Sequence, residues 1–401
     1  MKKVCFLADR HGLYDDRTYW KQALSLRNNG YEVHYLVIGD EDGQGITPEG
    51  IFFKLISSRR YFKNKYINWI VKKILPLTTE YDAAFIYCRE IEADAYQVED
   101  LRLNRIVHKL KNLPHKPKLI YDAREPHDNN LKDIEFGNSS LPAFLINLYA
   151  RYIQNWEYKK VRLYDYLFAV DDGLFERFQL QKTGVPLKVI YNFTNLADKR
   201  KDLPVKDRQY GAAYVGGLSK VRGAMVMLQA ARIVASRLPD FKLLLLGPVY
   251  GDGLAAEMNE YIASAGLSDN IILHEPVPYR DISVFYNQVK IGLNPLLDVK
   301  AHRDIIQIKL FEYMNFGIPV IASRFGYMQK YVEENEAGLT AEAGNERELA
   351  DAIIRLLTDE ALYEKCSRNG VKAVNELYNW GIMEKEFLGV YRGLLDKESS
   401  S

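Results

Sequence analysis

Short apolar runs rich in β-branched and aromatic residues alternate with longer segments of helical periodicity along most of the chain. Strands that alternate with helices form parallel sheets covered by helices, so this alternation predicts an α/β fold with two doubly wound domains. Ligands are expected at a cleft between the carboxyl ends of the strands. The expected strands lie at residues 4–8, 32–38, 83–87, 118–121, 166–170 and 188–191, and then at residues 212–215, 242–246, 270–273, 291–294 and 320–322.

A break separates these two series of strands. With 401 residues, the chain exceeds what one hydrophobic core usually organises, so two domains are expected. The run 193–209 has clustered charges and a proline but no apolar periodicity, which is typical of a linker. We predict a Rossmann-like domain over residues 1–195, a linker over 196–209 and a second Rossmann-like domain over 210–379.

Composition excludes some function classes. The 54 basic and 53 acidic residues leave a net charge of +1, so no nucleic-acid partner is expected. The three cysteines, Cys5, Cys88 and Cys366, have no metal-ligand spacing, which favours a reducing compartment and predicts no metal site. No apolar run suits a signal peptide or approaches the roughly 18 residues of a membrane span. We expect a cytoplasmic protein.

The segment 304–323 carries the strongest functional signal. Its apolar positions fit a helix packed on a sheet, Gly317 suits a left-handed helix end, and residues 320–322 suit a buried strand. If one helix runs from Asp304 to Glu312, the two carboxylates differ by about 800° of rotation and a rise of about 12 Å. Both would then face one cleft and contact different parts of an extended ligand. The alternative is that Asp304 caps the helix and Glu312 is a surface charge.

A glycine turn at 214–223 is a second candidate site. Gly216 and Gly217 follow an expected strand, and a helix is expected after Gly223. Glycines let backbone amides approach a phosphate, and the dipole at a helix N-terminus favours an anion. The alternative is a plain turn between strand and helix. The turn lacks the lysine-containing P-loop pattern, so ATP hydrolysis is not supported.

These segments resemble a known enzyme family. Residues 309–314, with the sequence Lys-Leu-Phe-Glu-Tyr-Met, followed by Gly317 and the run 319–323, resemble the signature of retaining glycosyltransferases of the GT-B fold, family four. That signature has two glutamates separated by seven residues, and Asp304 stands at the first position here. The resemblance extends along nearly the whole chain. It implies that residues 380–401 form a helix crossing back to the N-terminal domain.

Roles near the transferred sugar follow from this resemblance. It implies that Glu312 binds the ribose hydroxyls of the donor and that Asp304, one methylene shorter than the family residue, contacts the sugar. Arg124 stands where the family usually has a histidine beside that sugar. Either Arg124 takes over as a hydrogen-bond donor or His127 replaces the missing histidine. The catalytic candidates are therefore Asp304, Arg124 and His127.

The resemblance also implies a site for the donor diphosphate. Arg222 takes the role of the family's lysine, whereas Gly217 stands where the family usually has an arginine. Lys309 or Lys220 is then the candidate substitute for the missing cation. The donor-binding set is Gly216, Gly217, Arg222, Gly247, Val277, Lys309, Leu310 and Glu312.

The first domain is expected to bind the acceptor. His11, Gly12, Asp15 and Arg17 follow the first expected strand, and their segment resembles the start of polysaccharide-assembling members of the family. The alternative is that Asp15 and Arg17 pair as a helix cap. The predicted activity is that of a retaining, hexosyltransferase-like enzyme. It would use a UDP-type or GDP-type nucleotide sugar without a metal or cofactor and act on a saccharide or lipid-linked acceptor in cell-surface polysaccharide or glycolipid synthesis.

Two other functions share these features. A GT-B sugar-nucleotide 2-epimerase would use the same domains and diphosphate site but would convert the donor alone. A non-catalytic sugar-nucleotide-binding partner subunit is suggested by the three departures from the family pattern, Asp304, Gly217 and Arg124.

A membrane surface is a further predicted partner. The run 54–79 has seven basic residues and no acidic one, and its aromatic and apolar residues share one helical face. The run 101–121 adds six basic residues without an acidic one. A basic amphipathic helix can lie on an anionic membrane, which predicts peripheral association with the inner face of the membrane. The alternative is an ordinary helix that covers the sheet.

Overall fold

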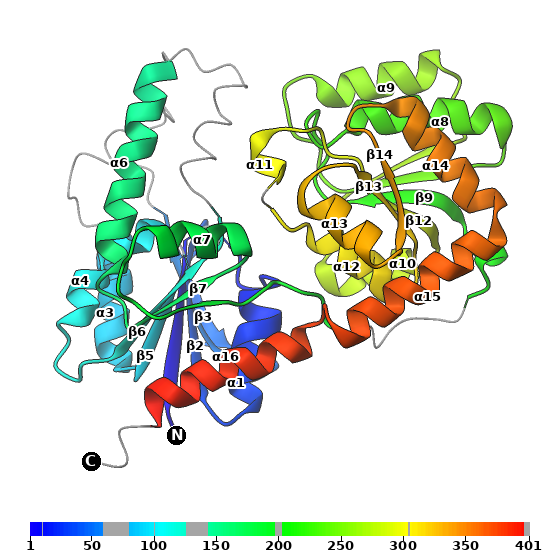
Figure 1. Cartoon of the computed structure of the whole chain (residues 1–401). Helices are drawn as coiled ribbons and strands as arrows, with labels where there is room; N and C mark the ends of the chain where they lie inside the picture. Colours follow the sequence, from blue (N-terminus) through cyan, green and yellow to red (C-terminus); the bar gives the residue numbers. More distant parts are fainter. Residues whose placement is uncertain are drawn as a thin grey trace. The chain divides into compact units, whose positions relative to one another are not determined.

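Two compact units make up the protein. The computed structural model describes residues 1–9, 11–58, 80–99, 101–125, 143–196, 203–303 and 305–396. Unit 1 comprises Met1–Asn192 together with Met383–Ser401, and unit 2 comprises Phe193–Ile382. Each unit contains a mostly parallel sheet with helices packed on it (Figure 1). The predicted α/β class with two Rossmann-like domains is therefore confirmed.

The sheet of unit 1 has eight strands. They are β1 (Lys3–Ala8), β2 (Glu32–Gly39), β3 (Gly43–Ile46), β4 (Phe52–Ser57), β5 (Ala95–Val98), β6 (Lys118–Ala123), β7 (Tyr166–Ala169) and β8 (Leu187–Val189). Their order is β3-β4-β2-β1-β5-β6-β7-β8, and only β3 runs antiparallel to its neighbour. Residues Val4 to Ala8 are fully buried, which accounts for the continuous apolar sequence of β1.

One expected strand of unit 1 is wrong. Residues 83–87 lie inside helix α3 (Glu80–Ile91). Its buried residues include Tyr81, Ala84 and Cys88, three and four positions apart, which is the spacing of one helix face. The other described helical segments are η1 (Thr18–Ala23), a π-helix, α1 (Leu24–Asn28), η2 (Leu101–Arg105), α4 (Val107–Lys111), α6 (Ala143–Val161), α7 (Asp172–Leu180) and α16 (Trp380–Leu395).

The last helix contributes to the core of the first unit. Phe387 and Tyr391 of α16 are fully buried, and Phe387 packs against Phe168 of β7 with ring centroids 5.5 Å apart. The hydroxyl of Tyr391 donates to the side-chain oxygen of Gln97 in β5 at 2.8 Å. The C-terminal part of the chain thus completes the unit that the N-terminal part begins.

Unit 2 has a six-stranded parallel sheet. Its strands are β9 (Tyr210–Val215), β10 (Leu243–Leu246), β11 (Ile271–His274), β12 (Val289–Asn294), β13 (Val320–Ser323) and β14 (Gly338–Ala341), in the order β11-β10-β9-β12-β13-β14. Its helical segments are η4 (Val205–Asp207), α8 (Ala224–Arg237), α9 (Leu254–Ser264), η5 (Tyr279–Asp281), α10 (Ile282–Tyr286), α11 (Lys300–Arg303), α12 (Ile308–Asn315), α13 (Gly326–Glu334), α14 (Glu346–Thr358) and α15 (Glu360–Glu376).

Strand order marks one position in each sheet. In each sheet, the chain adds strands on both sides of the first strand of the unit. β1 lies between β2 and β5, and β9 lies between β10 and β12. In open α/β sheets, ligands bind beside the carboxyl ends of the strands at such a switch point. The loops after β1 and β9 are therefore the places to look for function.

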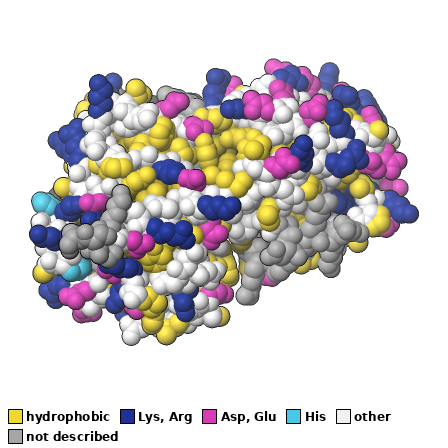
Figure 2. Space-filling model, turned by 60° about the horizontal axis from the view of Figure 1, so that its bottom comes forward, with side chains coloured by type: hydrophobic (Ala, Val, Ile, Leu, Met, Phe, Trp, Pro, Cys, Tyr) yellow, Lys and Arg dark blue, Asp and Glu magenta, His cyan; other side chains and the backbone are white. Residues whose placement is uncertain are grey.

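The surface carries charges of both signs. On the face drawn in Figure 2, basic and acidic side chains are interspersed, in keeping with the net charge of +1. Within the described residues, no helix combines the length and the apolar character that a membrane span requires. The basic run 59–79, predicted to face a membrane, lies outside the described residues.

Candidate functional site

Two glycine loops meet at the switch point of unit 2. Gly216 follows β9 with φ +131°, and Gly247 follows β10 with φ +143°. A Cβ added to Gly247 would lie 2.3 Å from the carbonyl oxygen of Gly216, so the two backbones are in direct contact. Only glycine permits both this approach and this backbone conformation.

The same loops explain the absence of the expected arginine. The amide of Leu218 donates to the carbonyl of Pro248, and the amide of Tyr250 donates to the carbonyl of Leu218, both at 2.8 Å. This pairing brings the Tyr250 ring over Gly217, where an added Cβ would lie 2.4 Å from a ring carbon. Tyr250 therefore occupies the space that a longer side chain at position 217 would need.

The helix in the strongest motif is shorter than predicted. It begins at Ile308, and residues 305–307 are not helical, so the rotation and rise derived for one helix from Asp304 to Glu312 are wrong. Asp304 itself lies outside the described residues. Gly317 has φ +65° and β13 follows it, as predicted.

Contacts with β9 hold α12 in position. The Tyr313 hydroxyl accepts from the amide of Val215 at 2.9 Å and donates to the carbonyl of Ala213 at 3.3 Å. Gly292 of β12 leaves room for this ring, since an added Cβ would lie 2.3 Å from it. These contacts of Tyr313 hold α12 against β9.

Lys309 is the most unusual side chain of unit 2. Lys309 is only 8% exposed. Its Nζ lies 3.7 Å from the centroid of the Tyr214 ring and 3.0 Å from a Cβ added to Gly216. No described residue forms a hydrogen bond or an ion pair with this ammonium group. Burial, reinforced by the nearby Arg222, lowers the pKa of Lys309 to about 7, and Glu312 acts in the opposite direction.

Glu312 lies one helical turn after Lys309 and is also buried. The hydroxyl of Tyr286 in α10 donates to its Oε2 at 2.7 Å. Burial together with the Glu312 carboxylate holds the pKa of Tyr286 well above its usual value, so this phenol remains a donor. Glu312 is thus a fixed carboxylate and not the surface charge of the alternative interpretation.

The remaining predicted donor residues have different environments. Arg222 is exposed, and its Nη1 donates to the carbonyl of Gly217 at 3.2 Å. Lys220 forms an ion pair with Glu257 at 2.6 Å on the surface. It is therefore not the substitute for the arginine that the family usually has at position 217. Leu310 is fully buried in the core, and Val277 lies half-buried in the loop after β11.

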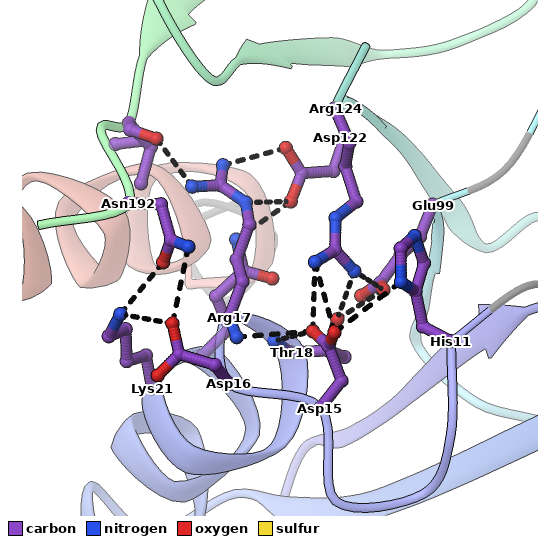
Figure 3. A network of polar contacts seen from close by, with 12 residues as sticks. His11, Asp15, Asp16, Arg17, Thr18, Lys21, Glu99, Asp122, Arg124 and Asn192 are labelled. Carbon is purple, nitrogen blue, oxygen red and sulfur yellow. Dashed lines mark hydrogen bonds and ion pairs between the residues drawn. The ribbon is translucent and has the colours of Figure 1, made fainter. Parts of the chain in front are cut away.

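A network of charged side chains occupies the switch point of unit 1 (Figure 3). Arg17, only 1% exposed, makes a bidentate pair with Asp122 of β6, with N–O distances of 2.8 and 2.9 Å. Its third donor contact is with the carbonyl of Ile190 at 2.6 Å. The Arg17 side chain therefore pairs with Asp122, and its guanidinium is enclosed in the unit. Asp15 does cap the start of η1, as the alternative assumed, because its Oδ1 accepts the backbone amides of Arg17 and Thr18 at 3.1 and 2.9 Å.

A second arginine links three of the predicted residues. Arg124 follows β6 and forms an ion pair with Asp15 at 2.9 Å and with Glu99 at 3.4 Å. His11 approaches the same Asp15 carboxylate at 3.5 Å. Gly12 is exposed in the turn that Asp15 closes through an amide-to-carbonyl hydrogen bond. His127, the proposed replacement for the missing histidine, lies outside the described residues.

Two carboxyl groups of this network have pKa values shifted in opposite directions. Burial opposes ionisation of Asp15, but the Arg124 and His11 charges outweigh it and lower the pKa of Asp15. Glu99 is fully buried, and burial holds its pKa well above the usual value despite Arg124. The hydroxyl of Thr18 donates to Glu99. The network therefore contains Asp15, whose pKa is lowered, and the fully buried Glu99, whose pKa is raised, and Arg124 contacts both.

Comparison with known proteins identifies a family that unit 2 resembles. Residues 197–373 match the family described as glycosyl transferases group 1. Most of unit 2 thus matches a glycosyl transferases group 1 domain. The resemblance noted in the motif around Glu312 is thereby confirmed for this part of the chain.

Curated relatives match over part of their length. The D-inositol 3-phosphate glycosyltransferase of Corynebacterium urealyticum is 26% identical over 50% of this chain and 46% of its own. The capsular polysaccharide biosynthesis glycosyltransferase CapM of Staphylococcus aureus is 26% identical over 58% of this chain and 55% of its own. The chain thus spans about half the length of these relatives.

Solved structures share the fold of the whole chain. HepE of Anabaena, solved with UDP-glucose, has a TM-score of 0.72 at 14% identity and covers 98% of this chain and 100% of its own. Sucrose-phosphate synthase of Thermosynechococcus elongatus has a TM-score of 0.69 at 17% identity and covers 99% and 100%. The chain therefore has a two-domain GT-B fold.

Sequence reasoning missed several residues that shape these sites. Tyr286, which binds Glu312, lies in a short helix without a motif, and Tyr250 lies in a loop whose pairing depends on another loop. In unit 1, Glu99 directly follows the buried strand β5, and Asp122 lies near the end of β6. Their positions at the carboxyl ends of strands were the sequence signal that could have identified them. Among the described residues, no group of three His, Cys, Asp or Glu side chains is arranged to hold a metal ion.

Proposed function

We propose that the protein is a retaining glycosyltransferase that takes its sugar from a nucleotide-sugar donor bound at the glycine loops of unit 2. The observation that carries this proposal is the buried ammonium of Lys309 at Gly216, which has no anionic hydrogen-bond partner among the described residues. Burying an unpaired charge is costly, so a site of this kind favours an anionic ligand. A diphosphate supplies that anion.

Neighbouring residues suit the rest of a nucleotide diphosphate. Lys309 and the nearby Arg222 are two cations for the diphosphate, and the carboxylate of Glu312 can accept hydrogen bonds from two ribose hydroxyls. Negative charge develops on the leaving diphosphate during transfer, and fixed cations stabilise that charge. In this proposal the chain's own cations act at the diphosphate without a metal ion or cofactor.

The donor and acceptor classes rest on the relatives. HepE was solved with UDP and with UDP-glucose, and CapM is a capsular polysaccharide biosynthesis glycosyltransferase. We therefore infer a UDP-type or GDP-type hexose donor and a saccharide or lipid-linked acceptor in cell-surface polysaccharide or glycolipid assembly. Retention of configuration rests on the resemblance of the Asp304–Glu312 spacing to the family signature. On the acceptor side, we propose that His11 and Asp15, whose side chains are 32% and 13% exposed, contact the acceptor.

Calorimetric titration with UDP, GDP and their hexose derivatives tests the donor site. We expect one of these series to bind, and we expect Lys309→Met to weaken its binding at least tenfold, because charge-assisted hydrogen bonds are worth about 1.5–3 kcal/mol each. Lys220→Met is the matched control, since this lysine also lies in unit 2 but pairs with Glu257 on the surface.

Turnover separates the proposed transfer from the alternatives. A transferase releases nucleoside diphosphate from the bound donor only slowly without an acceptor, and a saccharide or lipid-linked acceptor accelerates the release. A 2-epimerase would convert the donor alone, and a partner subunit would bind the donor without turnover. Equal binding by wild type and Lys309→Met would contradict the diphosphate role of Lys309.

A further inference from the structure

Tyr250 and Gly217 pack against each other in the loops of unit 2. A Cβ added to Gly217 would lie 2.4 Å from Cε2 and 3.0 Å from Cδ2 of the Tyr250 ring, closer than carbon atoms pack. Unlike Gly216, Gly217 does not have a positive φ, so its backbone conformation does not itself require glycine. The Tyr250 ring therefore accounts for the glycine at position 217.

Tyr250 is held by its backbone, and its side chain is exposed. Its amide donates to the carbonyl of Leu218 at 2.8 Å, and a parallel bridge joins Leu218 to Val249. The loops after β9 and β10 thus continue side by side beyond the sheet. Tyr250 is nevertheless 57% exposed, and its hydroxyl forms no hydrogen bond with the residues that the structure describes. An aromatic side chain held in this way loses little conformational entropy when a ligand binds it.

The hydroxyl end of the Tyr250 ring is the end that approaches Gly217. Cε2, the ring carbon nearest to the added Cβ, is bonded to the carbon that carries the hydroxyl. Cδ2 is one bond farther from the hydroxyl and is also farther from the added Cβ. The polar atom of this side chain thus lies beside the loop after β9.

Two cations converge on the same pair of glycines. Nη1 of Arg222 lies 3.1 Å from the Cβ added to Gly217 and donates to the Gly217 carbonyl at 3.2 Å. Nζ of Lys309 lies 3.0 Å from the Cβ added to Gly216. A phenol hydroxyl donates its strongest hydrogen bonds to ionised acceptors. Tyr250 is therefore a third donor at a place where two cations already favour an anion.

We propose that the Tyr250 hydroxyl donates a hydrogen bond to the diphosphate of the bound nucleotide sugar, at the place that a longer side chain at position 217 would reach. This inference rests on the proposed function and adds a residue to its donor site. The contact combines a neutral donor with the two cations of Lys309 and Arg222.

A neutral third donor has a consequence for selectivity. An intact nucleotide sugar has one negative charge on each phosphate, which two cations match. The released nucleoside diphosphate has additional negative charge, because a terminal phosphate ionises a second time with a pKa of about 6. A third cation in place of Tyr250 would therefore strengthen binding of the product more than binding of the sugar donor.

Tyr250→Phe tests the hydroxyl, since phenylalanine keeps the ring over Gly217. Calorimetric titration with UDP, GDP and their hexose derivatives identifies the series that the wild type binds. We expect Tyr250→Phe to bind that series at least tenfold more weakly, because a hydrogen bond to a charged group is lost. Tyr261→Phe is the matched control, because it removes the hydroxyl of a half-buried tyrosine in α9 of the same unit. Wild-type affinity in Tyr250→Phe would overturn the proposal.

An exchange of the two residues tests the place of the hydroxyl. Gly217→Arg alone forces a Cβ against the Tyr250 ring, so we expect weak donor binding, whereas the end of the flexible Arg222 side chain can move aside. The double variant Gly217→Arg, Tyr250→Ala makes room for a guanidinium. It should bind more tightly than Tyr250→Ala, with a larger gain for the nucleoside diphosphate than for the nucleotide sugar. A double variant that binds no better than Tyr250→Ala would contradict the proposed place of the hydroxyl.

Titration of the wild type separates failure of this inference from failure of the proposed function. If the wild type bound neither series, both would be wrong. If Lys309→Met lost the binding of the wild type and Tyr250→Phe kept it, the donor site would be supported and the role of Tyr250 refuted. Chemical denaturation of each variant checks that the protein is folded.

Discussion

At the scale of single residues, Lys309 links donor binding to pH. Its pKa is about 7 in the free protein, so the ammonium loses its proton as the pH rises above 7. A bound diphosphate favours the charged form and raises this pKa. We therefore expect the affinity for an intact nucleotide sugar to be highest below pH 7 and to fall above it, by at most about tenfold per pH unit.

Calorimetry from pH 6 to 8.5 measures this dependence, since both phosphates of an intact nucleotide sugar stay ionised across the range. Lys309→Arg should flatten the profile, because arginine stays charged throughout. A wild-type profile as flat as that of the arginine variant would contradict the assignment.

The contribution of Lys309 to the stability of the free protein has the opposite dependence on pH. Between pH 7 and 10.5 the unfolded chain holds the proton that folded Lys309 has lost, so this group makes stability rise with pH.

Glu312 gives a second prediction at this scale. If its carboxylate accepts two ribose hydroxyls, Glu312→Ala removes charge-assisted hydrogen bonds of about 1.5–3 kcal/mol each, and donor use should fall at least tenfold. Steady-state kinetics or donor titration measures the loss. Glu257→Ala removes a surface carboxylate of the same unit and should leave donor use unchanged. An unaltered Glu312→Ala enzyme that is still folded would refute the ribose role.

At the scale of elements, the loops after β9 and β10 depend on backbone contact. Gly247→Ala would place a Cβ 2.3 Å from the carbonyl oxygen of Gly216 at a φ of +143°. We expect a loss of about 1–3 kcal/mol in the free energy of unfolding, with weaker donor binding because Gly216 must move. Chemical denaturation and donor titration measure the two effects.

Gly253 supplies the matched control for that element. It also has a positive φ, +76°, at the start of α9, but an added Cβ would meet no atom within 4 Å. Gly253→Ala should therefore show only the backbone strain, about 1–2 kcal/mol, and normal donor affinity. If both variants lost the same donor affinity, contact between the two loops would not be the cause.

At the scale of the whole molecule, the chain returns to its first unit at the end. Phe387 of α16 is fully buried against Phe168 and Tyr391 in unit 1. Phe387→Ala should cost about 3–5 kcal/mol of unfolding free energy. Hydrogen exchange should accelerate in β1, β5 and β7 and stay unchanged in the sheet of unit 2, and nucleotide affinity should be preserved. Leu377→Ala, at a half-exposed position, is the control. Equal acceleration in both sheets would contradict this division of the fold.

Much of the fold could be predicted from local sequence. Residues 4–8 of β1 and all residues of β9 and β10 lack charged side chains because both faces of a central parallel strand are buried. Gly317 has the predicted left-handed conformation, which costs glycine nothing. Glu312 was a candidate from its spacing to Asp304 and from the family resemblance, and Lys309 was a candidate from the resemblance alone. Lys309 lies beside Gly216 of the glycine loops.

The sequence by itself thus determined the class of fold and the segments that carry chemistry, since periodicity and turn residues report local burial and backbone conformation. Tertiary structure decided what each charged group does. Arg17 pairs with Asp122, 105 residues away, because strand order brings their loops together. Residues 83–87 became helical because α3 buries Tyr81, Ala84 and Cys88 on one face. The pKa of Lys309 is low because the side chain is buried and Arg222 is near. Both conditions arise from packing between elements that are distant in sequence, which local periodicity does not report.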